Sequence, residues 1–155
     1  MSNSTKIIKT LVAVLALSAI VGCARMDSPS QQSRAASDAE LAGAWYQIYF
    51  DTSSATVNPR GQLVIDNAAN IAMNAGPTRV TVIGRTDRVG SAPDNLALAH
   101  QRANAVRDAL IAAGVPSAEI DTSWSGESNQ AVSTANDADE PRNRVVDVTV
   151  VQQPR

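Results

Sequence analysis

Residues Gly84–Arg102 read G-R-T-D-R-V-G-S-A-P-D-N-L-A-L-A-H-Q-R, a stretch that contains the end of one element, a loop and the start of the next. The β-branched residues before it predict a strand that ends at its first glycine. Ser91 and Asp94 have the spacing of a helix-capping pair, which predicts a helix over about 94–113. Arg102 lies two turns into that helix. A loop that folds back over the helix start can therefore bring Arg102 and Asp87 to one pocket.

Strand and helix signals alternate on both sides of this stretch. Aromatic residues over 45–50 predict the first strand. Asn58-Pro59 predicts the start of a helix, because Asn is a good N-cap and Pro is tolerated at the first helical position. The apolar residues that follow recur at spacings of three and four, which predicts one buried helical face. This face comprises Val64, Ala68, Ile71 or Ala72, and Ala75.

The second helix and the two strands after it show similar patterns. The helix has one apolar face, and the strands alternate on either side of a long polar loop over 126–143. The alternation favours a core position for Trp124 over a role as a stacking platform. The predicted faces comprise Ala99, Ala103, Val106 and Leu110 in the helix, Ile120, Thr122 and Trp124 in the third strand, and Val146, Val148 and Val150 in the last strand.

The order of elements is strand, helix, strand, helix, strand, loop, strand. Alternating strands and helices favour a sheet with helices packed on it. Right-handed crossovers place both helices on the same face. The sequence therefore predicts one α+β domain, a β/α sandwich with a mixed four-stranded sheet and two main helices on one face.

Composition excludes several classes of function. The formal net charge is -2, so there is no basic field to attract nucleic acid. The single cysteine excludes an intrachain disulfide and a cysteine-only metal site, and the single histidine excludes the H-E-x-x-H motif. We therefore expect no metal and no cofactor. Glycan cleavage needs a placed carboxylate pair, and covalent catalysis needs a nucleophile beside a base. No such constellation is recognisable, so we expect a protein that is not an enzyme.

The N-terminus has the layout of a secretory signal. Lys6 and Lys9 precede an apolar run over 10–21 that is too short for a comfortable membrane span. The run ends at I-V-G-C, which resembles a bacterial lipobox with Cys23 as the lipidated residue. The alternative is a buried free thiol in an uncleaved anchor. We expect a signal peptide over 1–22, a lipidated N-terminus with acyl chains such as palmitate and a flexible tether over 23–43, and a folded domain over 44–155.

Asp87 and Arg102 suit a ligand that carries both charges. The planar guanidinium of Arg102 can hold a carboxylate by two parallel bonds, and Asp87 can accept from an ammonium group. Backbone N–H groups at the start of the second helix add partial positive charge. The alternative is that Asp87 and Arg102 pair with each other in a salt bridge that only steadies the loop.

Six motifs, in order along the chain, carry a family resemblance. They are Tyr49-Phe50-Asp51, Thr86-Asp87-Arg88-Val89-Gly90, Asn95-Leu96-Ala97-Leu98, Arg102-Ala103-Asn104-Ala105-Val106, Gly126-Glu127-Ser128 and Asn143-Arg144. Together they resemble the peptidoglycan-binding signature of OmpA-like C-terminal domains. The resemblance covers roughly residues 49–150 and implies the OmpA-like β/α sandwich.

The resemblance also implies a ligand and a set of site residues. Members of this family bind the peptide stem of peptidoglycan without a covalent bond, commonly at the amino and carboxyl groups of meso-diaminopimelate. By this likeness Asp87 and Arg102 bind those two groups. Five further residues would complete the site. Asn95 and Leu96 would shape the base of the pocket, Thr86 would support the loop, Asp51 would form part of the rim, and Arg144 would close the pocket from the side.

Three departures from the family pattern bear on affinity. Arg85 replaces the histidine of G-H-T-D, Ala99 replaces a frequent serine, and Val145 replaces the second arginine of N-R-R-V-E. Among other residues, we expect His100 to be solvated or at an edge, and Asp139 and Glu140 to be solvated loop residues.

The leading hypothesis is a lipoprotein of the outer membrane, with its domain in the periplasm, that anchors the envelope to the cell wall. Ala24, after the lipidated cysteine, favours the outer membrane. The alternative is a periplasmic scaffold component of a larger envelope assembly, which would act through protein partners.

Overall fold

The computed structural model describes residues 43–154. In chain order they form β1 (Ala44–Tyr49), α2 (Pro59–Asn74), β2 (Thr78–Arg85), α3 (Ala92–Ala112), β3 (Ile120–Gly126) and β4 (Val145–Gln152). Short 3-10 helices at Ser117–Glu119 and Pro141–Asn143 precede β3 and β4. Each strand and helix expected from the sequence is present, which confirms the predicted order of elements.

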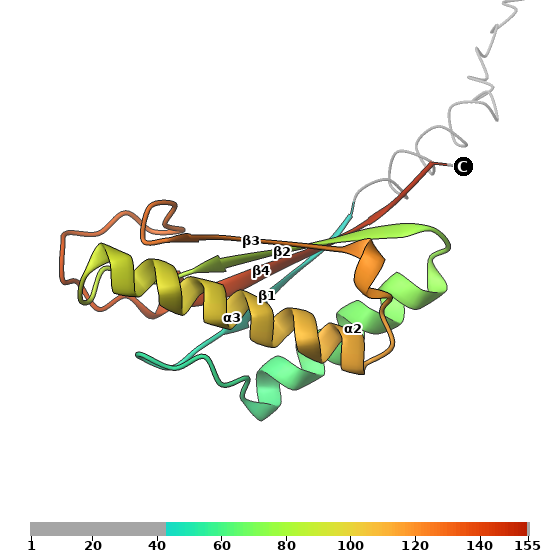
Figure 1. Ribbon diagram of the computed structural model, residues 1–155, viewed down its shortest axis with the longest axis horizontal. Coiled ribbons are helices and arrows are strands. Elements are labelled where there is room, and N and C mark those ends of the chain that lie inside the picture. The colour runs from blue at the N-terminus through green and yellow to red at the C-terminus, as the bar shows by residue number, and fades with distance from the viewer. Residues whose placement is uncertain (1–42, 155) are drawn as a thin grey trace, which may run out of the picture.

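The four strands form one mixed sheet in the order β1-β4-β2-β3. β4 runs antiparallel to β1 and β2, whereas β2 and β3 are parallel. The last strand of the chain is therefore central, and it is buried along most of its length. Both helices cover the same face of the sheet (Figure 1), which confirms the predicted α+β architecture.

The core lies between this face and the helices. Its sheet side comprises valines that alternate along β2 and β4, and the predicted face of α3 is completely buried. The predicted face of α2 is correct at Ala68 and at Ala72, the alternative to the exposed Ile71, but it missed the buried Ile65. Gly61 also faces the sheet, where a Cβ would lie 2.9 Å from a methyl group of Ile48. The buried face of α2 comprises Gly61, Ile65, Ala68, Ala69 and Ala72.

Gly84 brings α3 into direct contact with the backbone of β2. A Cβ on Gly84 would lie 2.1 Å from the carbonyl oxygen of Ala99, so only glycine fits at this position. Arg102 follows Ala99 by about one helical turn. The close approach therefore places the Arg102 side chain at the carboxyl end of β2.

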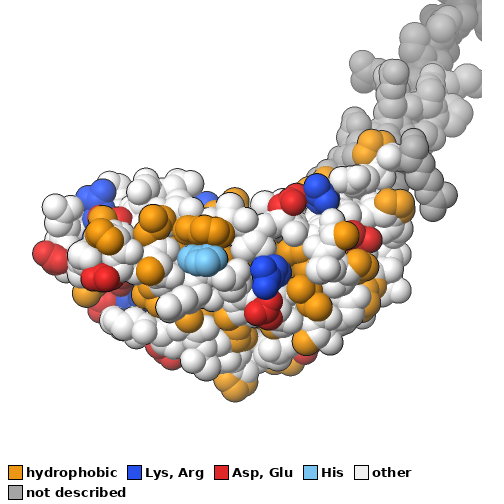
Figure 2. All heavy atoms as spheres, in the orientation of Figure 1, with side chains coloured by type: hydrophobic (Ala, Val, Ile, Leu, Met, Phe, Trp, Pro, Cys, Tyr) orange, Lys and Arg blue, Asp and Glu red, His pale blue; other side chains and the backbone are white. Residues whose placement is uncertain are grey.

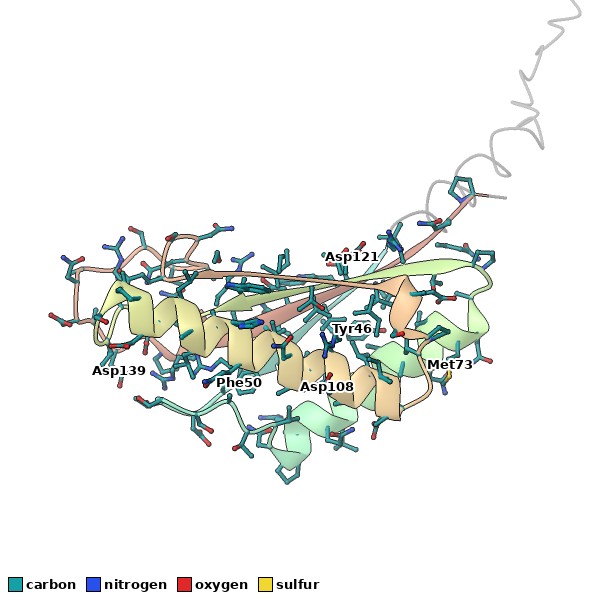
Figure 3. All side chains as sticks on the ribbon, viewed as in Figure 1. Tyr46, Phe50, Met73, Asp108, Asp121 and Asp139 are labelled. Carbon is teal, nitrogen blue, oxygen red and sulfur yellow. The ribbon has the colours of Figure 1, made fainter. Side chains whose placement is uncertain are left out.

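The start of α3 is fixed by its N-cap. The Ser91 hydroxyl accepts from the backbone N–H of Asp94 at 3.3 Å and donates to the Asp94 carboxylate at 2.6 Å. This confirms the predicted capping pair. β2 ends, and the loop before α3 begins, at the same end of the domain as Asp139 (Figure 3). Met73 lies at the opposite end.

The face of the sheet away from the helices carries polar side chains. On this face the Arg85 guanidinium pairs with the Asp147 carboxylate at 2.9 Å, and the Gln47 amide donates to the same carboxylate at 3.0 Å. Arg85 therefore points away from the helices, and its side chain does not replace histidine in the predicted pocket. Ala99 and Val145, at the other two departures from the family pattern, are buried.

Trp124 differs from its prediction. Trp124 lies in β3 as expected, but its side chain is 40% exposed, because β3 is an edge strand with a neighbouring strand, β2, on one side alone. The predicted core position is therefore wrong.

The segments predicted as signal peptide, lipidated Cys23 and tether lie outside the described residues, apart from Gly43. Within residues 43–154, neither helix combines the length and the apolar character needed to cross a bilayer.

Candidate functional site

Asp87 lies in the loop between β2 and α3 and is 5% exposed. The loop is held in place because the backbone N–H of Thr86 donates to the carbonyl of Gly126 at 3.0 Å, which joins the ends of β2 and β3. One carboxylate oxygen of Asp87, Oδ2, accepts from Nη1 of Arg144 at 2.9 Å. A buried aspartate is thus paired with an arginine that is 57 residues away in the chain.

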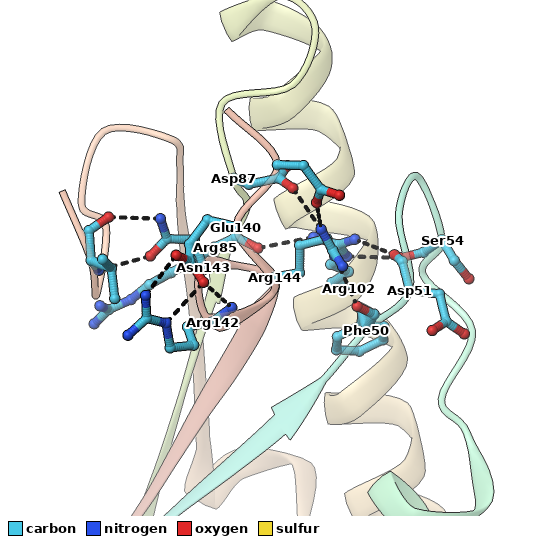
Figure 4. A network of polar contacts seen from close by, with 12 residues as sticks. Phe50, Asp51, Ser54, Arg85, Asp87, Arg102, Glu140, Arg142, Asn143 and Arg144 are labelled. Carbon is cyan, nitrogen blue, oxygen red and sulfur yellow. Dashed lines mark hydrogen bonds and ion pairs between the residues drawn. The ribbon is translucent and has the colours of Figure 1, made fainter. Parts of the chain in front are cut away.

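Arg102 is completely buried, and its guanidinium donates to three backbone carbonyls. Nε donates to Ser54 at 2.7 Å, and Nη2 donates to Asp51 at 2.9 Å, both in the loop between β1 and α2. Nη1 donates to Arg85 at 3.2 Å, at the end of β2. Figure 4 shows this guanidinium between the two segments. Arg102 therefore links the β1–α2 loop to the carboxyl end of β2, one of the two central strands of the sheet.

Burial has an electrostatic cost for Arg102. Desolvation lowers its pKa to about 10, while the charge of Asp87 acts to raise this pKa and the charge of Arg144 acts to lower it. The ring of Phe50 lies 5.2 Å from the guanidinium carbon, which adds a cation–π contact. Arg102 remains protonated at neutral pH, and its positive charge is retained inside the domain.

Asp87 and Arg102 come to the same end of the domain, as predicted, but they do not form a direct ion pair among the described residues. The alternative of a loop-steadying salt bridge between these two residues is therefore wrong. The partner of Asp87 is Arg144, and the hydrogen bonds of Arg102 go to backbone carbonyls.

Arg144 connects the buried aspartate to the surface. Its Nε donates to the carbonyl of Phe50 at 3.3 Å, and its Nη1 contacts the carboxylates of both Asp87 and Asp139. Burial acts to lower the pKa of Arg144, but the hydrogen bonds to the two carboxylates outweigh this effect and raise it. The side chain of Asp139 is 66% exposed.

Asp139 is an exposed loop residue as expected, but the prediction missed that Asp139 and Glu140 each pair with an arginine. The Glu140 carboxylate accepts from Nε and Nη2 of Arg142 at 2.9 and 2.8 Å. These side-chain hydrogen bonds lower the pKa of Glu140 to about 2. Each acid thus binds an arginine that follows it by no more than five residues: Asp139 binds Arg144, and Glu140 binds Arg142.

The other predicted site residues lie around this network. The buried Asn95 amide donates to Glu127 at 2.7 Å, and Leu96 is 47% exposed beside it. Thr86 is completely buried, and its hydroxyl has no hydrogen-bond partner among the described residues. Asp51 contributes its carbonyl to Arg102, whereas its side chain is exposed.

A pocket opens beside Arg144 on the β1–α2 side. It has a volume of about 270 Å³, and its lining includes Phe50, Asp51 and Arg144. Asp87 and Arg102 do not line this pocket; they form its buried support. Residues 43–154 contain no group of three or more histidine, cysteine or acidic side chains that could hold a metal ion.

A sequence profile of the OmpA family matches residues 49–144. The chain belongs to the OmpA family. The family assignment made from the motifs is thereby confirmed.

Two relatives show the extent of the similarity within the OmpA family. The chain is 36% identical over 103 residues to the probable lipoprotein YiaD of Escherichia coli K12, and 36% identical over 102 residues to outer membrane protein A of Atlantibacter hermannii. These matches cover 66% and 64% of this chain, but 47% and 42% of the relatives. The chain thus matches less than half the length of each.

Solved structures show the same OmpA-family fold. The peptidoglycan-associated lipoprotein from Burkholderia pseudomallei has 29% identity and a TM-score of 0.62, over 67% of this chain and 88% of that one. The C-terminal domain of Helicobacter pylori MotB has 26% identity and a TM-score of 0.60, over 70% of this chain and 85% of that one.

Sequence reasoning on this OmpA-family domain missed the residue that holds the long loop before β4. Asn143 is completely buried, and its amide accepts from the N–H of Val132 at 2.9 Å and donates to the carbonyl of the same residue at 2.8 Å. The motif Asn143-Arg144 is visible in the sequence, but no pattern around Val132 marks it as the partner of Asn143. Asn143 thus fixes the segment that carries Asp139.

Proposed function

We propose that this chain is an outer-membrane lipoprotein, acylated at Cys23, whose OmpA-family domain binds the peptide stem of peptidoglycan in the periplasm and anchors the envelope to the cell wall. The family assignment supports this proposal, as do the relatives named as lipoproteins, one of them peptidoglycan-associated. The binding is non-covalent, and the chain is not an enzyme.

The observation that carries the proposal is the buried charge cluster at the end of β2. Two buried arginines, Arg102 and Arg144, lie around one buried aspartate, Asp87. Burial of charge without an equal countercharge is costly, so the cluster favours an additional anionic group. The exposed carboxylate of Asp139 supplies that group in this structure.

Diaminopimelate fits this cluster by its two end groups. Its carboxylate would replace the Asp139 carboxylate on Arg144, and its ammonium group would lie against Asp87. The network also suggests different roles for the two arginines, since the hydrogen bonds of Arg102 are already committed to carbonyls. Arg102 would contribute its charge and hold the Asp51 rim. Thr86 would support the loop, and Asn95 and Leu96 would shape the base of the pocket.

The test is a calorimetric titration of the full chain, solubilised in mild detergent, with meso-diaminopimelate and with lysine, which lacks one carboxylate. We expect saturable binding of the first ligand, weaker binding of the second, and loss of both in Asp87→Ala and Arg102→Ala. Truncation of one partner in a buried charge contact typically costs about 2–5 kcal/mol, which is enough to abolish a weak complex.

Two further variants sharpen the test. Asp139→Asn removes the competing carboxylate and should increase the affinity for diaminopimelate. Arg107→Ala, on the solvent side of α3, removes a charge that pairs with Asp108 and should leave affinity unchanged. If a folded wild-type chain binds neither ligand, the stem-peptide proposal is wrong and the scaffold function through protein partners takes its place. A clearing band in zymography on purified peptidoglycan would contradict the absence of catalysis.

A further inference from the structure

An aromatic pair lies on the surface between α3 and the edge strand β3. The rings of His100 and Trp124 have centroids 4.0 Å apart and are inclined by 33°. Both side chains are exposed, and Leu96, one helical turn before His100, is exposed as well. Figure 2 shows hydrophobic side chains beside the single histidine on this face. We refer to Leu96, His100 and Trp124 as the aromatic ledge.

Two adjoining pockets continue from the ledge toward the tip of the domain. The first, of about 310 Å³, is lined by residues that include Leu96 of the ledge and Ser125, the neighbour of Trp124 in β3. The second, of about 250 Å³, is lined by residues that include Arg88 and Gln130. Glu127 and Ser128 line both, so the two pockets form one groove. Ledge and groove together make an elongated surface.

The groove is lined mainly by neutral polar side chains. They include Ser125, Ser128 and Gln130. The formal charges of the groove are those of Arg88 and Glu127, which cancel. An uncharged polar ligand therefore matches the groove better than an anionic polymer does.

We propose that the aromatic ledge and the groove bind an N-acetylated amino-sugar strand, the glycan part of peptidoglycan. A pyranose ring presents a flat face of C–H groups, which packs on exposed aromatic rings, and an edge of hydroxyl and acetamido groups, which suits neutral polar side chains. An extended chain of such rings can lie on the ledge and enter the groove at the same time.

This inference rests on the proposed function and extends it to a second part of the same polymer. The groove adjoins the proposed stem-peptide site, because Glu127 in the groove accepts a hydrogen bond from Asn95. A stem peptide bound at Asp87 would therefore bring the glycan strand from which it branches to the groove. Binding two linked parts of one polymer raises the overall affinity through effective concentration.

The experiment uses the full chain in mild detergent with Trp45→Phe, so that Trp124 is the sole tryptophan. The ligand is peptide-free glycan strand prepared from peptidoglycan, and N-acetylglucosamine tetramer is a simpler probe. We expect a saturable change in Trp124 emission with either sugar and none with diaminopimelate. Loss of one aromatic stacking contact corresponds to about a tenfold loss of affinity, which we expect by calorimetry for Trp124→Ala.

Controls separate this site from a general loss of structure. Ser128→Arg changes an exposed residue, blocks the groove and should weaken glycan binding, while Trp45→Ala, at the other exposed tryptophan, should not. Diaminopimelate affinity should stay within about twofold in each variant, because the two sites do not share these side chains.

The outcomes distinguish the two proposals. If diaminopimelate binds and the sugars do not, or if Trp124→Ala and Ser128→Arg bind glycan as the wild type does, the glycan site is wrong and the stem-peptide function stands. If the sugars bind with the expected variant pattern and diaminopimelate does not bind, the stem-peptide site is wrong and the glycan site stands.

Discussion

Replacement of Arg102 by methionine tests whether this buried arginine holds the site together. Methionine fills most of the volume of the arginine stem but donates no hydrogen bond. The change leaves the carbonyls of Asp51, Ser54 and Arg85 without their donor. The variant therefore tests the hydrogen bonds of Arg102 separately from the volume that its side chain fills.

The magnitude follows from these three carbonyls. A buried acceptor without a donor costs about 1–3 kcal/mol. The two carbonyls of the β1–α2 loop lie near solvent and can regain water, so they fall at the low end of this range. The variant is also relieved of the desolvation that lowers the pKa of Arg102 to about 10, which offsets part of the loss. We expect a net loss of about 3 kcal/mol, a large share of the roughly 5–15 kcal/mol typical of a domain.

The assay is urea unfolding at pH 7, followed by circular dichroism. With a slope of about 2 kcal/mol per molar urea, the midpoint should fall by about 1.5 M. Hydrogen exchange should accelerate over residues 51–56 before the rest of the domain opens. The matched control is Arg107→Met on the same helix, whose surface pair with Asp108 predicts a change of less than about 0.5 kcal/mol.

One result would refute this reasoning. Exchange of a buried charge for an apolar side chain can be neutral or stabilising when no polar partner is left behind. If Arg102→Met unfolds at the same urea concentration as Arg107→Met, or at a higher one, then the three carbonyls do not depend on the guanidinium.

Three further predictions concern the frame of the site. Asn143→Ala should lower the free energy of unfolding by about 2 kcal/mol and speed proteolysis of the loop over 127–140, because the Asn143 amide makes two backbone hydrogen bonds there; unchanged cleavage would argue against the role. Gly84→Ala should cost about 3 kcal/mol or more, since the new methyl group would lie 2.1 Å from the Ala99 carbonyl oxygen, and an unchanged melting temperature would contradict this. Carboxyl NMR titration should give a pKa of about 2 for Glu140, below its usual 4.5. The stabilisation linked to Glu140 is then complete above about pH 4.5 and is lost as the pH falls toward 2. In Arg142→Ala the pKa should return toward 4.5, and no return would exclude the arginine as its cause.

Local signals were sufficient for much of the fold. The end of β2, the Ser91 cap and the buried face of α3 were predicted because each depends on residues within a few positions of one another. The face of α2 was predicted less well, because Gly61 in its first turn carries no apolar signal although it packs against the sheet. The exposure of Trp124 was missed because alternation does not tell an edge strand from a central one.

The sequence by itself determined the element order, the family and the approximate position of Asp87 and Arg102 at one end of the domain. Only the tertiary structure decided which charges pair. Arg144 reaches Asp87 across 57 residues, and Arg102 reaches Ser54 across 48, because the sheet order β1-β4-β2-β3 places the last strand beside both the first and the second. Residue spacing along the chain does not encode sheet order, which depends on the packing of all four strands against the two helices.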